Sequence, residues 1–164
     1  MGQYFKLVNL DKREFVDPHV VGTGLKQYEQ IVNCPGTASA CIVLLSAQRE
    51  RRGGGDVDPE GRPVVGSWAG DRIALIGDYA ERGDLKPKDN ADLIYVLCNN
   101  KNYVKTHLAN LKLSGGQQEA RRLRRQLTTK GVFRDISLAV AAVLEQELGG
   151  KFTGTGWRQW ERGK

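Results

Sequence analysis

The residues best suited to chemistry lie between Arg51 and Asp84, a segment rich in glycine and aspartate around the short apolar run Ile73–Ile76. Consecutive backbone amides can point at one phosphate group, and gathered carboxylates can hold a divalent cation. We therefore expect a small anionic ligand, such as a nucleotide or a phosphate compound, to bind here, with Mg²⁺ as a candidate cofactor. The expected ligand-binding residues are His19, Arg52, Gly53, Gly54, Gly55, Asp56, Trp68, Asp71, Arg72, Asp78 and Arg82.

The glycine-rich loop Arg51–Asp56 reads RRGGGD. Its amides would cradle the anion while the two arginines add positive charge. The loop is not a Walker motif, because no G-K-S/T follows it. The alternative is an ordinary surface loop flanked by turn aspartates. Trp68 is expected to be exposed beside the ligand. His19 is expected either to contact it as an acid or base or to be a structural loop residue.

The segment Gly77–Gly83 reads GDYAERG and resembles the G-D-x-V-D-R-G box of calcineurin-like metallophosphatases. The resemblance implies that Asp78 bridges two metal ions and that Arg82 helps to hold phosphate, as in a metal-dependent phosphohydrolase. The chain departs from the family in having two histidines, His19 and His107, where the binuclear site needs several. Glu81 also stands in place of the second aspartate. A phosphohydrolase is therefore an alternative hypothesis.

The whole chain has a net charge of +6 and a pI near 9.3. Its positive charge is concentrated in the C-terminal half. A basic helix flanked by tryptophans is typical of a nucleic-acid-binding surface, with the indole rings as stacking platforms for bases. A nucleic-acid-binding or protein-binding module is thus a second alternative. The basic face can equally be an ordinary solvated helix surface with no binding role. The residues expected to carry nucleic-acid binding are Arg121, Arg122, Arg124, Arg125, Trp157, Arg158 and Trp160.

The bulk properties bound the class of protein. At 164 residues and 40% hydrophobic content, the chain predicts one globular domain spanning residues 1–164. No apolar run is long enough to span a bilayer, so no membrane partner is expected. The N-terminus lacks the features of a signal peptide, and three cysteines without C-x-x-C spacing indicate free thiols. We therefore expect a cytoplasmic protein, and the sequence leaves its oligomeric state open.

The apolar pattern predicts an α+β fold with a small, mainly antiparallel sheet and about four helices. Runs of branched and aromatic residues bounded by turns predict strands at Gln3–Leu10, Glu14–Val16, Arg72–Ile76 and Leu93–Cys98. Helical spacing predicts one helix opening near Thr23 with Leu25, Tyr28, Ile31 and Val32 on its apolar face. Further helices are expected at Thr37–Gln48, where a strand is the alternative, around Tyr103–Leu111, around Ala120–Leu127 and at Asp135–Leu148. A last strand is expected in the tail Lys151–Lys164.

Several of these segments also carry a resemblance. The motifs MGQY at the N-terminus, VNLDK at Val8–Lys12, GGGD at Gly53–Asp56, SWAGDRI at Ser67–Ile73 and GDYA at Gly77–Ala80 are similar to those of a group of short, uncharacterised bacterial and phage proteins. The likeness covers about the first half of the chain. The resemblance implies no activity and no ligand.

Overall fold

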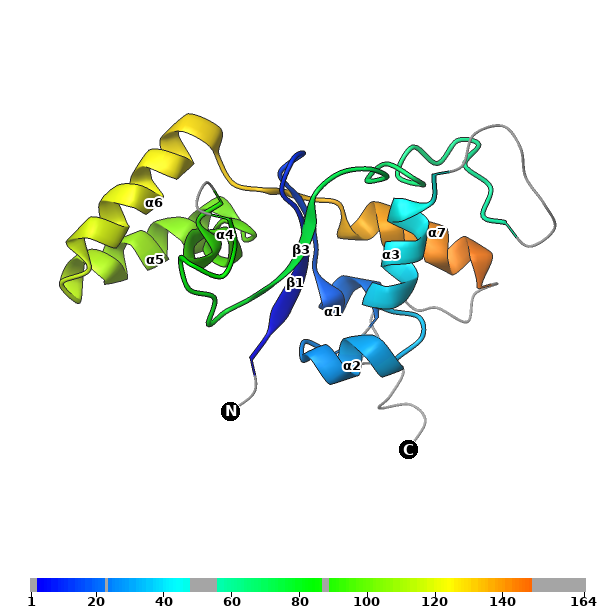
Figure 1. The fold of residues 1–164 in the computed structure, drawn as a ribbon, viewed down its shortest axis with the longest axis horizontal. Helices are drawn as coiled ribbons and strands as arrows, with labels where there is room; N and C mark the ends of the chain where they lie inside the picture. Colours follow the sequence, from blue (N-terminus) through cyan, green and yellow to red (C-terminus); the bar gives the residue numbers. More distant parts are fainter. Residues whose placement is uncertain (1–2, 23, 48–55, 87–88, 149–164) are drawn as a thin grey trace.

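A four-stranded sheet divides the protein into two helical layers (Figure 1). The structure is a computed structural model that describes residues 3–22, 24–47, 56–86 and 89–148. The strands lie in the order β3-β1-β2-β4, and their bounds are β1 Phe5–Asn9, β2 Glu14–Val16, β3 Ile73–Gly77 and β4 Arg134–Asp135. Strand β1 pairs antiparallel with both β2 and β3, whereas the short β4 pairs parallel with β2. The sheet is therefore mixed, with a mainly antiparallel centre.

Strands β1 and β2 are buried on both faces. Because successive side chains of a strand point to opposite sides, neighbouring residues enter different cores. Leu7 and Val16 belong to one apolar cluster, and Val8 and Phe15 belong to the other. Each face of the sheet must consequently be covered by its own set of helices.

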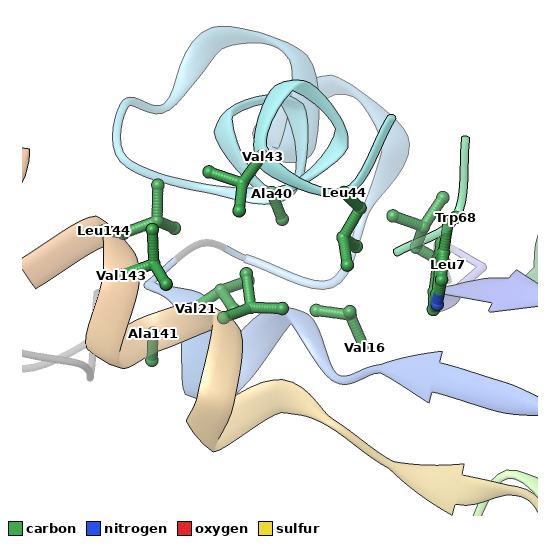
Figure 2. Packing of buried hydrophobic residues seen from close by; sticks show 11 residues of the cluster. Leu7, Val16, Val21, Ala40, Val43, Leu44, Trp68, Ala141, Val143 and Leu144 are labelled. Carbon is green, nitrogen blue, oxygen red and sulfur yellow. The ribbon is translucent and has the colours of Figure 1, made fainter. Parts of the chain in front are cut away.

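Seven helices cover the two faces within the described residues. The first cluster is formed with α1 Pro18–Val21, α3 Thr37–Leu45 and α7 Ser137–Glu147, and α2 Gln27–Val32 packs against α3. Figure 2 shows Val16, Val21 and Leu44 facing one another between α3, α7 and the sheet. The second cluster is formed with α4 Ala91–Leu97, α5 Lys101–Leu113 and α6 Gln117–Lys130.

The predicted α+β class is confirmed, and so are the strands β1, β2 and β3 and the helices α3, α5, α6 and α7. The helix predicted near Thr23 forms as α2, which begins at Gln27. More helices form than the four expected, because α1 and α4, of four and seven residues, are helical as well. Elements that short show too little periodicity to be recognised. Cys34, Cys41 and Cys98 are free thiols, as predicted.

The strand predicted at Leu93–Cys98 is wrong, because this segment forms α4. A continuous apolar run fits a buried helix as well as a buried strand. Here Leu93, Ile94, Val96 and Leu97 all pack into the second cluster, so an apolar surface all round the segment is satisfied by a helix.

The apolar face predicted for the helix near Thr23 is also wrong. Tyr28, Ile31 and Val32 are 75%, 74% and 52% exposed, and the buried residue of α2 is Gln30. The Gln30 amide donates to the carbonyls of Phe5 and Leu25, at 3.1 and 2.8 Å, which fixes α2 to the start of the sheet through polar contacts. Thr23 itself and the strand predicted at 151–164 lie outside the described residues.

A buried lysine joins β1 to both helical layers. Lys6 Nζ donates to the carbonyl of Cys98 at 2.6 Å and to Asn99 Oδ1 at 3.2 Å, and it pairs with Asp17 at 3.3 Å. It also lies 4.9 Å from the centre of the Phe15 ring. Three acceptors match the three donors of an ammonium group, so the charge is buried in a fully satisfied state.

Trp68 closes the first cluster from the loop that precedes β3. Its side chain is fully buried, and Nε1 donates to the buried carboxylate of Glu14 at 2.7 Å. The loop is held over α3 by backbone bonds from Gly66 to Val43 and from Trp68 to Leu44. Gly66 has φ 68°, and a Cβ there would lie 2.3 Å from the carbonyl oxygen of Ser46, so both conformation and space require glycine.

The substitution Trp68→Phe should therefore lower the free energy of unfolding by about 2–4 kcal/mol, since it leaves a cavity and removes a buried hydrogen bond to a carboxylate. Urea unfolding followed by circular dichroism measures the loss. Tyr28→Phe, at an exposed aromatic residue of α2, is the matched control and should change stability by less than about 0.5 kcal/mol. A loss of that small size for Trp68→Phe would contradict the assigned packing.

Candidate functional site

The residues expected to bind a ligand lie in separate surroundings. Asp71 and Arg72 precede β3, whereas Asp78 and Arg82 follow it. Seven residues of nearly extended chain span about 23 Å. The two turns are therefore at opposite ends of the sheet. His19 lies exposed in α1 on the side of the first cluster, and Arg52, Gly53, Gly54 and Gly55 lie outside the described residues.

Two of the expected ligand residues instead hold the protein's turns together. Asp71 accepts a hydrogen bond from Asn9 at 2.7 Å and pairs with Lys12 at 3.0 Å, and these contacts lower the pKa of its carboxyl group. Arg72 pairs with Asp11 and Asp89, both at 2.6 Å. These contacts fix the β1–β2 turn against the segment that precedes β3.

Asp78 and Trp68 have structural surroundings as well. One Asp78 carboxylate oxygen accepts from the backbone N–H of Tyr4 at 2.9 Å, which holds the edge of β1 to the end of β3. The expectation that Trp68 is exposed is wrong, because the loop folds its indole into the core. Asp56 is exposed. Within the described ranges, no three His, Cys, Asp or Glu residues gather as they would around a metal ion.

Two adjoining cavities lie between the β1–β2 turn, α4 and α6, and we call them together the α6 groove. The smaller has a volume of about 190 Å³, with apolar walls formed by Leu10, Leu93, Ile94, Leu97 and Phe133. Its polar residues are Asp11, Arg13, Asp89, Asn90, Gln126 and Lys130. The larger cavity, of about 490 Å³, shares Asn90, Leu93, Gln126 and Lys130 and adds Arg82, Arg122, Arg125 and Thr129.

Helical spacing explains how α6 lines this groove. Positions i, i+3, i+4 and i+7 of a helix share one face, and Arg122, Arg125, Gln126 and Thr129 follow that spacing. Leu123, on another face, is buried in the second cluster. The basic set predicted for nucleic acid is therefore divided. Arg122 and Arg125 line the groove, whereas Arg121 and Arg124 are exposed outside it.

The groove is cationic. It is lined by five basic residues, Arg13, Arg82, Arg122, Arg125 and Lys130, and by the two acids Asp11 and Asp89. Both acids are paired with the single guanidinium of Arg72, which offsets one of their two negative charges. Of the basic residues, Arg122 is held by Asn90 and by both oxygens of Asp92, at 2.9–3.0 Å. Arg82, Arg125 and Lys130 have no ion pair within the described part of the protein, and their charges face solvent and the cavity.

Arg13 is a residue that the sequence did not single out. It has φ 55°, a left-handed conformation that costs a non-glycine residue about 1–3 kcal/mol. Its guanidinium lies 4.2 Å from the centre of the Phe133 ring and donates to the carbonyl of Gly131 at 2.8 Å. Burial lowers the pKa of Arg13, and its Nε is buried without a partner among the described residues. A cation in a strained turn thus lines the smaller cavity, while its Nε lies beneath the surface.

The sequence also missed Asn90, Gln126, Thr129 and Lys130. For Gln126 and Thr129 a signal exists, because they follow Arg122 at helical spacing. Asn90 precedes a segment whose pattern predicts a strand, and Arg13 enters the groove through a turn conformation that its residue type does not indicate.

No protein-family model, curated protein or solved structure matches the chain. In the described part of the protein, no helix is long and apolar enough to cross a membrane. The functional conclusion therefore rests on the α6 groove and its charge.

The two groove arginines should differ in their effect on stability. Arg122→Gln removes a bidentate pair that holds α6 to the first turn of α4, and it should lower the free energy of unfolding by about 1–2 kcal/mol. Arg125→Gln, the matched control three residues along the same face, should change it by less than about 0.5 kcal/mol. Urea unfolding of both variants checks this, and equal losses would contradict the distinction between an arginine held by Asp92 and one that faces solvent.

Proposed function

We propose that this protein binds nucleic acid through the helical hairpin α5–α6 and the α6 groove. The observation that carries the proposal is the distribution of charge. Residues 101–130 contain eight lysines and arginines and one glutamate, a net charge of +7, against +6 for the whole chain. The remaining residues together are therefore close to neutral, at −1. Such a concentration of positive charge on one element is typical of a surface that meets a polyanion.

The shape of the hairpin suits this partner. Helices α5 and α6 have 13 and 14 residues, about 20 Å each, and they extend away from the sheet (Figure 1). Their long side chains can follow a phosphate backbone, because Arg and Lys form charge-assisted hydrogen bonds to phosphate oxygens. The cations Arg82, Arg125 and Lys130 line the recess at the base of the hairpin.

Trp157, Arg158 and Trp160 lie outside the described residues, so their part in binding stays a prediction from the sequence. The cytoplasm remains our proposal for the compartment, where nucleic acid is abundant and the three free thiols are compatible with a reducing environment.

A second candidate is a small anionic ligand, such as a nucleotide or a phosphate compound. It is supported by the smaller cavity, whose volume of about 190 Å³ and apolar wall fit a small molecule better than a duplex. The glycine-rich loop Arg52–Gly55 keeps its predicted role only as a hypothesis, because it lies outside the described residues. The α6 groove provides an alternative seat for the same kind of ligand.

Fluorescence anisotropy with a labelled 20-nucleotide strand tests the proposal. The double variant Arg125→Glu/Lys130→Glu should lower affinity at least about 10-fold at low salt, because it removes two phosphate partners and adds two repulsive charges. The dependence of log K on log salt should also become shallower, by about 0.7 for each phosphate of the single strand that the variant no longer neutralises.

The matched control reverses a charge on the opposite layer. Lys26→Glu, an exposed residue at the start of α2, should leave both affinity and salt slope within about twofold of the wild type, because it lies far from the expected phosphate partners. Equal losses for the control and the groove variant would indicate a general charge effect and would contradict binding at α6. A wild-type protein that binds no strand at low salt would refute the proposed function itself.

A further inference from the structure

We infer that the smaller cavity of the α6 groove is a slot for one unpaired base, so that the nucleic acid bound there is single-stranded. The inference rests on the proposed function and adds the form of the partner. A cavity of about 150 Å³ accepts a benzene molecule. The volume here is about 190 Å³, which admits one aromatic ring of a strand but not a base pair.

The walls of the slot fit the chemistry of a base. Leu93, Ile94 and Leu97 of α4 supply an apolar wall, against which one face of a base can pack. The Arg13 guanidinium, which lies 4.2 Å from the Phe133 ring centre, brings a planar cation to the same space. Guanidinium planes are among the surfaces on which unstacked bases are bound.

Polar groups at the slot can read the edge of the base. Asn90 uses its Oδ1 to accept from Arg122, and its amide NH₂ has no hydrogen bond to a described residue. Gln126 likewise forms no side-chain hydrogen bond within the described ranges. Arg13 Nε is buried with no partner in this part of the chain, so it is closed to a group placed in the slot. Two amides beside an apolar wall are the arrangement of a site that orients a ring by its edge.

The neighbouring cavity supplies the phosphate contacts that a nucleotide needs beside its base. The two cavities share Asn90, Leu93, Gln126 and Lys130, so a group in one is adjacent to a group in the other. Arg82 and Arg125 then lie next to the flanking phosphate. Asp11 and Asp89 of the slot share the single positive charge of Arg72, so one negative charge is left beside the cations Arg13 and Lys130 of the same lining.

A duplex would meet the same cations but would have to extrude a base to fill the slot. Extrusion requires unpairing and unstacking of the base, which a single strand avoids. We therefore expect the protein to bind a thymidine 20-mer at least about 10-fold more tightly than a 20-base-pair duplex at the same salt concentration. Fluorescence anisotropy with the full chain measures both affinities.

The variant Gln126→Trp tests the slot directly, because it places a ring at the mouth of the cavity from a partly exposed position on α6. Its affinity for the thymidine strand should fall to that for the duplex, and duplex affinity should be unchanged. Thr128→Trp adds the same ring to the exposed face of the same helix and should alter neither. Should Gln126→Trp fail to fold by circular dichroism, Gln126→Leu keeps the volume, removes the amide and should lower single-strand affinity about threefold or more.

The outcomes separate the two proposals. Equal affinity for strand and duplex, unaffected by either Gln126 variant, overturns the slot and leaves nucleic-acid binding by the hairpin in place. No binding of either form overturns the proposed function as well. Thymidine monophosphate is the third arm. If it competes fully with the strand at concentrations near the Kd of the strand, the slot serves a free nucleotide and the inference of a single-stranded partner is wrong.

Discussion

The burial of β1 on both faces is the constraint on which the rest of this structure depends. Leu7 enters one apolar cluster and Val8 enters the other, so neither face of the sheet is left to solvent. The buried charge of Lys6 is satisfied by groups from both sides, Asp17 before α1 and Cys98 and Asn99 after α4. Two independent helical layers follow, and the basic hairpin α5–α6 belongs to one layer alone.

The two helical layers differ in their charge. The layer of α1, α3 and α7 holds the cluster that Trp68 closes and has little net charge to balance. The hairpin α5–α6 collects like charges, which repel one another and disfavour a compact state. Only part of this repulsion is offset inside the protein. Arg122 is paired with Asp92, whereas Arg82, Arg125 and Lys130 lack ion pairs among the described residues. A bound polyanion would supply the missing partners, which is the physical reason to expect one.

The sequence predicts secondary structure best where a residue pattern is compatible with only one kind of element. The run of aromatic and branched residues before Asn9, the turn after it and the apolar stretch before Gly149 predict β1, β2 and α7. Helix α7 begins at Ser137, after Ile136, and not at the predicted Asp135, which ends β4. The apolar run Leu93–Cys98 fits a strand or a helix, and it forms a helix whose apolar residues are buried in the second cluster. The site depended on tertiary contacts instead. The burial of Trp68 and the turn of Arg13 are set by distant partners, Glu14 and Phe133.

The hairpin α5–α6 with its α6 groove, and not the layer of α2 and α3, should receive nucleic acid. Two-dimensional amide NMR spectra recorded during titration with a short thymidine strand test this most directly. We expect saturable shifts at Arg13, Asn90, Arg125 and Lys130, with the amides of α2 and α3 unmoved. Shifts centred on α2 and α3, or none at saturating strand, would contradict binding at the groove.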